Sequence, residues 1–125
     1  MKATAISPAQ ALREVLRGER PLNDLNDIGM CFHIEQTADG TRCWVDNPQQ
    51  ITVIASLADL AHGLLALLHD PSALREWALF VNASDVDFDP EGQTAGEALL
   101  EAIHDASFGN RIESRVLAEV RGIAK

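Results

Sequence analysis

The stretch "IGMCFHIEQTADGTRCWVD", residues 28–46, decides the predicted fold because apolar and polar side chains alternate on both sides of a turn. Asp39-Gly40 is a strong signal for a two-residue hairpin turn, which would pair Ala38 with Thr41. In this register one face holds Met30, Phe32, Ile34, Cys43 and Val45, and the other holds His33, Glu35, Arg42 and Trp44. The segregation predicts an antiparallel hairpin with one face against a core.

The segments around the hairpin define the fold class. "NPQQ" predicts a turn at Pro48-Gln49, and "ITVIA" at 51–55 is β-branched enough to be a third strand. Apolar periodicity and capping residues predict a helix at 7–17 and four later helices, at 57–69, about 71–82, 95–107 and after Asn110. The prediction is one α+β domain, residues 1–125, with an N-terminal helix, a three-stranded antiparallel meander at about 29–55, then four packed helices.

The helical stripes separate a predicted core from a predicted surface. Trp77 lies among apolar residues on one face of its helix, so we expect it to anchor the core. Asp59, His62 and His69 lie opposite the leucine stripe of helix 57–69, so we expect them to be exposed.

The two cysteines and the N-terminal sequence indicate a cytoplasmic protein. The predicted register places Cys31 opposite Pro48 and Cys43 opposite Gln36, too far apart for a disulfide, so we expect buried, reduced thiols. "MKATAISPAQ" lacks the apolar stretch of a secretory signal, and no apolar run reaches the roughly 18 residues of a membrane span.

The negative charge is concentrated in one region. The net charge is -9, and residues 59–105 carry ten acidic residues and one basic residue, Arg75. Nucleic acid is a poor partner for such a surface because phosphate binding needs Lys and Arg. A basic protein is a better candidate, since complementary charge speeds encounter. The alternative is that the acidity only keeps the protein soluble.

The segment "SDVDFDPEGQ", residues 84–93, is the most acidic part of the chain. It begins like a calcium loop but has Pro90 where that loop needs Gly and Gly96 where it needs Glu, so we predict no metal site. We predict instead a solvated loop that continues into an acidic helix face and binds a partner. The predicted partner-binding residues are Asp85, Asp87, Asp89, Glu91, Glu97, Glu101 and Asp105.

Motifs that would indicate catalysis are missing from the sequence. It contains no Ser/His/Asp order, no CxxC, no Gly-rich phosphate loop and no HExxH. We therefore predict neither an enzyme nor a cofactor.

A resemblance adds a functional expectation. The stretch "LREWALFVNASDVDF…GEALLEAIHDASFGNRI" resembles the C-terminal part of small bacterial immunity proteins of polymorphic or contact-dependent toxin systems, through Trp77, Ala78, Leu99, Leu100 and "SFG" at 107–109. The resemblance implies a non-enzymatic inhibitor whose acidic surface covers a basic toxin domain.

Two alternatives remain open: an acidic chaperone of the kind used in secretion, and a structural or regulatory domain. A chaperone should expose a few hundred Å² of contiguous apolar area, and an immunity protein should not.

Overall fold

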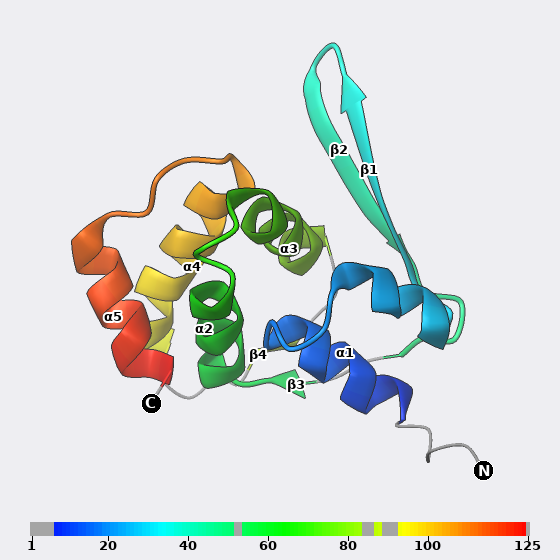
Figure 1. The fold of residues 1–125 in the computed structure, drawn as a ribbon, viewed down its shortest axis with the longest axis horizontal. Helices are drawn as coiled ribbons and strands as arrows, with labels where there is room; N and C mark the ends of the chain where they lie inside the picture. Colours follow the sequence, from blue (N-terminus) through cyan, green and yellow to red (C-terminus); the bar gives the residue numbers. More distant parts are fainter. Residues whose placement is uncertain (1–6, 52–53, 84–86, 89–92, 125) are drawn as a thin grey trace.

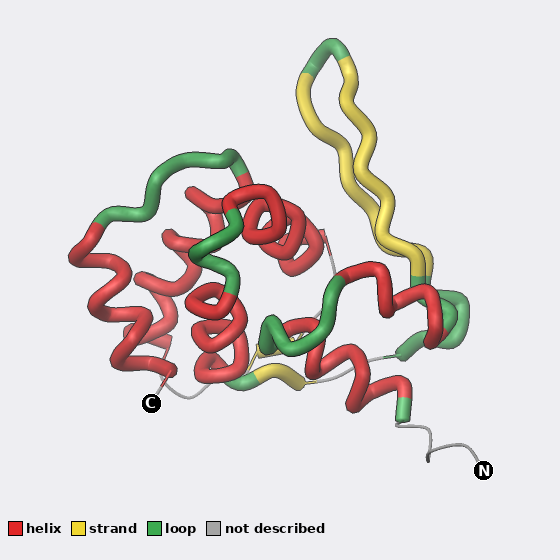
Figure 2. The backbone as a smooth tube through the Cα atoms, in the orientation of Figure 1, coloured by secondary structure: helices red, strands yellow, loops and turns green. Residues whose placement is uncertain are grey.

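The β1–β2 hairpin projects away from a cluster of helices (Figure 1). The computed structural model describes residues 7–51, 54–83, 87–88 and 93–124. Figure 2 shows that helices form most of the chain and that the hairpin accounts for most of the strand residues. The elements in order are α1 (Pro8–Leu16), the 3-10 helix η1 (Leu22–Ile28), β1 (Cys31–Thr37), β2 (Gly40–Asp46), β3 (Ile54–Ala55), α2 (Leu57–Ala66), α3 (Pro71–Ala83), β4 (Asp87–Phe88), α4 (Gln93–Ser107) and α5 (Ser114–Ala124).

The α+β class agrees with the prediction, but the three-stranded meander is wrong. In the described residues β1 pairs only with β2, and β3 pairs in parallel with β4. The predicted turn after the hairpin does form, with Gln50 N donating to Asn47 O at 3.0 Å. The Asn47 side chain then bonds both backbone groups of Ile51, at 2.8 and 3.0 Å. These bonds use the backbone groups with which Ile51 would have paired to β2, so the chain leaves the hairpin there.

The hairpin register differs from the prediction by two residues. Thr37 pairs with Gly40, so Ala38 and Asp39 are the turn residues. The predicted turn type needs positive φ at both central residues, whereas here Gly40 follows the turn at φ 134° and neither turn residue has positive φ. A shift of two residues keeps every side chain on its face, so the predicted segregation of faces is correct. Cys31 now faces Asp46 rather than Pro48, and the thiols are free as predicted.

The base of the hairpin packs against the helices through apolar side chains, whereas near its tip the contact is a hydrogen bond from Arg75 Nη2 on α3 to Thr41 Oγ1. Phe32 and Val45 are half-buried against the core, and the Phe32 ring meets the Phe80 ring edge-to-face at 5.5 Å. Ile34, one step further along β1, is exposed. Cys31 is also exposed and Cys43 half-buried, so the prediction that both thiols are buried is wrong.

The five predicted α-helices form in the predicted order, and the described residues add the 3-10 helix η1, which was not predicted. α4 begins at Gln93, two residues before its predicted start, and two other helix ends are shifted. α2 stops at Ala66 because Leu67 N and Leu68 N bond to carbonyls three residues back, which tightens the last turn. α5 begins at Ser114 rather than directly after Asn110.

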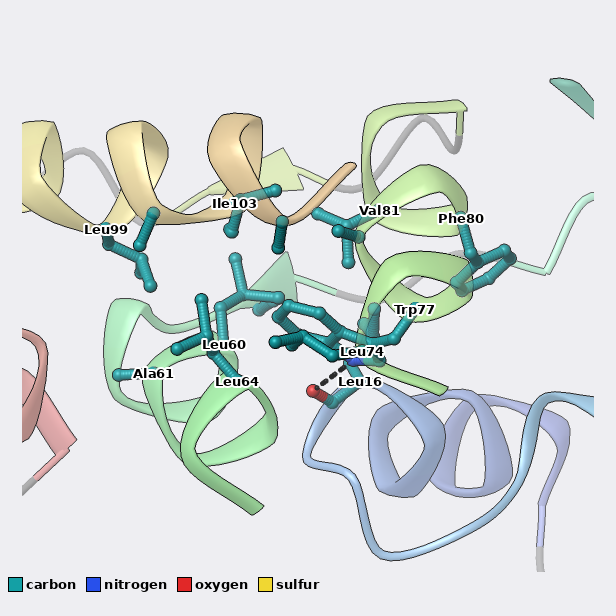
Figure 3. Close-up of a cluster of buried hydrophobic side chains, with 14 of the residues drawn as sticks. Leu16, Leu60, Ala61, Leu64, Leu74, Trp77, Phe80, Val81, Leu99 and Ile103 are labelled. Atoms are coloured by element: carbon teal, nitrogen blue, oxygen red, sulfur yellow. Dashed lines mark hydrogen bonds between the residues drawn. The ribbon is translucent and has the colours of Figure 1, made fainter. Parts of the chain in front are cut away.

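The core lies where α2, α3, α4 and α5 meet the end of α1. Trp77 is 1% exposed, as predicted, and its indole Nε1 donates to the backbone O of Leu16 at 3.1 Å in the middle of the leucine cluster (Figure 3). Leu60, Leu64 and the other large apolar residues of this cluster are almost fully buried. Because Leu16 O lies at the end of α1, where carbonyls lack helical partners, Trp77 both fills the core and satisfies a buried acceptor.

A close approach of α1 to α2 depends on Gly63. A Cβ atom at this position would lie 2.1 Å from Leu16 O and 2.8 Å from Cζ2 of Trp77. His62 directly precedes Gly63 on α2, and its Nδ1 lies 2.9 Å from Arg17 O. Because a carbonyl only accepts, this ring nitrogen carries the proton. Two carbonyls at the end of α1 are therefore capped by side chains from α2 and α3.

Replacing Trp77 by Ala should destabilise the fold by about 3–5 kcal/mol, because it opens a cavity and leaves Leu16 O without its donor. Trp44, which is 39% exposed, provides the matched control, and Trp44→Ala should cost about 1 kcal/mol or less. Urea unfolding measures both. A loss below about 1 kcal/mol for Trp77→Ala would contradict its place in the core.

Two glycines in helices, Gly63 in α2 and Gly122 in α5, should respond in opposite directions to Ala. Gly63→Ala should destabilise by about 1–3 kcal/mol or more, because the new methyl group meets a backbone oxygen that cannot move aside. Gly122 has no heavy atom within 4 Å of its Cβ position, so Gly122→Ala should stabilise by about 0.4–1 kcal/mol. Thermal unfolding of the pair tests the close approach, and equal effects would refute it.

Candidate functional site

Helix α4 presents two opposite faces of different character. Its buried stripe packs against α3 and α5 and consists of Leu99, Ala102, Ile103 and Ala106, all 3% exposed or less. Residues three and four apart share a helix face, so positions 97, 100, 101, 104 and 108 lie on the other side. We call this surface the α4 face, and it consists of Glu97, Leu100, Glu101, His104 and Phe108, all exposed.

Two large apolar side chains lie on the α4 face among the carboxylates. Leu100 is 53% exposed and Phe108, one residue beyond the helix end, is 67% exposed. The His104 ring packs edge-to-face on the Phe108 ring, with centroids 4.9 Å apart. The α4 face is therefore an apolar strip flanked by acidic groups.

The carboxylates of the α4 face are little neutralised. Arg115 on α5 lies 3.5 Å from Glu101, and it also pairs with Glu113 at 3.1 Å. Such exposed, shared pairs contribute roughly 0–1 kcal/mol. Glu97 has no ion-pair partner among the described residues. The face keeps most of its negative charge.

The other predicted partner-binding residues fall in three situations. Asp105 lies at the edge of the α4 face and is half-buried. The backbone of Asp87 belongs to β4, where it pairs with Ile54, so this part of the acidic loop is tied to the body. Asp85, Asp89 and Glu91 lie outside the described residues.

Asp59 does not belong to the acidic surface, contrary to prediction. It is 1% exposed and binds Arg17 Nη1 at 2.6 Å and Arg13 Nε at 3.2 Å. It also closes a capping box with Ser56 at the start of α2. The predicted exposed face of α2 faces α1 instead, and His62 on the same face is half-buried.

Burial and ion pairing have opposite effects on the Asp59 carboxyl. Burial alone would raise the pKa, but the hydrogen bond from Arg17, those from Ser56 and the charge of Arg13 outweigh it and hold the pKa below its ordinary value. The same pair raises the pKa of Arg17. The carboxylate is therefore a structural anion that joins α1 to α2.

The outer face of the hairpin carries a second exposed aromatic group. The rings of His33 and Trp44 stack with centroids 5.0 Å apart, and Arg42 Cζ lies 5.8 Å from the Trp44 ring. His33 Nε2 lies 2.7 Å from Asp46 Oδ2, so the predicted contact between these residues exists, although they are diagonal rather than opposite. These contacts link His33, Arg42, Trp44 and Asp46 to one another on this face.

Within the part of the chain that the structure describes, no three His, Cys, Asp or Glu side chains gather in a way that could hold a metal ion. No helix in that part is long and apolar enough to cross a membrane.

The exposure of Leu100 and Phe108 was not predicted, although the sequence contained a signal for it. Both residues fall outside the apolar stripe of their helix, formed by Ala95, Leu99, Ala102, Ile103 and Ala106. A large apolar residue outside the stripe is a candidate contact residue. The pairing of Asp59 with two arginines more than 40 positions earlier had no such signal.

Comparisons with known protein families, with curated proteins and with solved structures find no match for this chain.

Asp59→Asn should lower the free energy of unfolding at pH 7 by about 1.5–3 kcal/mol, because charged hydrogen bonds of that value are weakened. The folded pKa lies below the unfolded value of about 3.9, so this contribution is complete above that pH and is lost as the pH falls through the folded pKa. The difference between wild type and variant should therefore be constant above about pH 5 and shrink below about pH 4. Urea unfolding across this range, with exposed Asp27→Asn as control, measures it.

Proposed function

We propose that this protein is a non-enzymatic protein-binding module that inhibits a basic partner, in the manner of a toxin immunity protein, and that the α4 face is its contact surface. The observation that carries the proposal is the exposure of Leu100 and Phe108 beside Glu97 and Glu101. Binding sites between proteins commonly combine a few apolar anchors, which are desolvated on binding, with a charged rim.

Each half of this arrangement has its own role. Phe108 and Leu100 supply area that gains free energy when covered, and such anchors carry most of the energy of an interface. The negative charge comes from Glu97 and Glu101, from Asp105 at the edge of the face, and from the loop before the helix. The loop residues are Asp85, Asp87, Asp89 and Glu91. Charge of one sign steers a basic partner and raises the association rate.

The rigid support of α4 favours this surface over the hairpin. The opposite side of α4 is packed against α3 and α5 with almost no exposure. A face held by a buried stripe presents its side chains in a fixed arrangement, which lowers the entropy cost of binding. The outer part of the hairpin has no such buried stripe, since Ile34 and Trp44, on its two faces, are both exposed.

The chaperone alternative requires a contiguous apolar groove. The large hydrophobic side chains that are exposed in the described residues are Ile34, Trp44, Leu100 and Phe108, and they lie in two separate regions, the β1–β2 hairpin and the second half of α4 with the residue that follows it. This distribution favours a small acidic contact surface over a long apolar one.

The double variant Glu97→Lys/Glu101→Lys should lower the association rate with the partner by about 10-fold or more at low salt, because it removes the steering charge. Leu100→Ala and Phe108→Ala should each weaken binding by about 2 kcal/mol, mainly by faster dissociation. Surface plasmon resonance with the protein encoded by the neighbouring gene measures both, and co-expression tests whether that protein inhibits growth unless this chain is present.

The matched control for charge is Asp27→Lys/Glu119→Lys, which makes the same change at exposed positions away from the α4 face. Both double variants change the net charge of the protein by the same amount. Beyond the effect of that shared change, the control should keep the association rate within about twofold of wild type. All variants should unfold within about 0.5 kcal/mol of wild type because these residues are exposed. An association rate that responds equally to both double variants would refute the α4 face as the contact surface.

A further inference from the structure

A groove lies between the tip of the hairpin, α3 and the end of α4, and it shares His104 and Phe108 with the α4 face. Its volume is about 420 Å³, and its lining comes from β2, from α3 and from the end of α4. The lining residues are Gly40, Thr41, Arg75, Leu79, Asn82, His104, Ser107 and Phe108. The volume lies within the range of about 300–1,000 Å³ typical of small-molecule sites.

The charge of this groove is opposite to that of its surroundings. Arg75 is the one basic residue between positions 59 and 105 of a chain with net charge -9. None of the described residues that line the groove is Asp or Glu. An anion that enters it meets a guanidinium and no opposing carboxylate on the walls.

Arg75 has hydrogen-bonding capacity left for a ligand. Its Nη2 donates to Thr41 Oγ1 at 3.3 Å, and no carboxylate pairs with it among the described residues. A guanidinium carries five N–H donors, so most of them remain available. The Arg75 side chain passes close to Gly109, where a Cβ would lie 3.8 Å from its Cδ, so the stem is placed between α3 and the turn after α4.

The walls combine polar and apolar groups in the way that ligand sites do. The side-chain amide of Asn82 and the imidazole of His104 have no side-chain hydrogen bond within the described part of the chain, so both can bind a ligand. Leu79 and the exposed ring of Phe108 provide apolar surface beside them. A few convergent donors next to apolar walls fix the orientation of a small molecule with one polar end.

We propose that this groove binds a small organic carboxylate with an apolar body, its carboxylate paired with Arg75 and its body against Leu79 and Phe108. A planar guanidinium matches a carboxylate with two parallel hydrogen bonds. The site goes beyond the proposed inhibitor function and does not depend on it, because no partner protein contributes to the groove.

Backbone NMR of the wild-type chain titrated with phenylacetate and 4-methylpentanoate tests the site directly. Saturable shifts are expected at the amides of Gly40, Thr41 and Phe108. The neutral amides phenylacetamide and 4-methylpentanamide are the matched ligands, and they should bind at least about tenfold more weakly because they lose the charged hydrogen bonds. Equal binding of acid and amide, or no saturable shift from either acid, would overturn the proposal.

Variants separate the role of Arg75 from that of total charge. Arg75→Gln should weaken phenylacetate binding at least about tenfold, while Arg121→Gln, the same change at an exposed position on α5, should not. Arg75→Lys keeps the charge without the two-pronged geometry and should fall between them. Unchanged binding by Arg75→Gln would refute the assigned contact.

A second variant keeps the test valid if Arg75→Gln loosens the hairpin. Phe108→Ala leaves the Arg75–Thr41 bond in place and removes only an exposed ring. It should reduce the affinity for phenylacetate towards that for acetate. If the variant still prefers phenylacetate to acetate, the assignment of Phe108 as the apolar wall is wrong.

An acetylated dipeptide ending in Phe should bind no more tightly than phenylacetate. Tighter binding of the dipeptide would mean that the groove binds the C-terminal end of a peptide chain instead.

Discussion

The close contact between the end of α1 and the middle of α2 is the constraint on which the rest of the structure depends. Gly63 allows Leu16 O to approach α2, and from there the carbonyl reaches the indole of Trp77 on α3. Asp59 adds the two arginines of α1 to the same junction. Because a helix end buried without partners is costly, these bonds decide where α1 can lie. One glycine, one indole and one carboxylate thus fix three helices relative to each other.

The sequence predicted elements well where the signal is local. Periodicity and capping residues located the five α-helices, and alternation assigned the hairpin residues that were predicted for each face correctly. Register and pairing were less predictable because they depend on competing local bonds. Asn47 redirects the chain after β2, and the conformation of Gly40 moves the turn by one residue. The first effect is two hydrogen bonds, each contributing about 0.5–1.5 kcal/mol net, and the second is the conformation of one residue. Such local terms are enough to change a strand pairing and cannot be read from composition.

The acidic surface illustrates the same limit for the candidate site. Spacing alone placed Glu97 and Glu101 on one exposed helix face, and the structure agrees. It could not distinguish them from Asp59, which also carries a carboxylate and lies on a helix but is buried in an ion-pair cluster. The difference comes from Arg13 and Arg17, whose positions relative to α2 are a tertiary property. Counting charges along a chain therefore overstates the acidity of the surface by the number of carboxylates that fold inward.

Because α4 has a buried face and an exposed face, the exposed face can change in sequence without disturbing the core. Leu99, Ile103 and the small residues between them hold the helix in place, and they lie opposite Leu100 and Phe108. Substitutions on the exposed side touch neither this stripe nor the α1–α2 junction, so each should change stability by only about 0.5 kcal/mol. A binding surface built this way can change its charge and its apolar anchors while the fold stays constant. That separation suits an inhibitor, because its specificity depends on a few anchor residues and on charge that rejects the wrong partner.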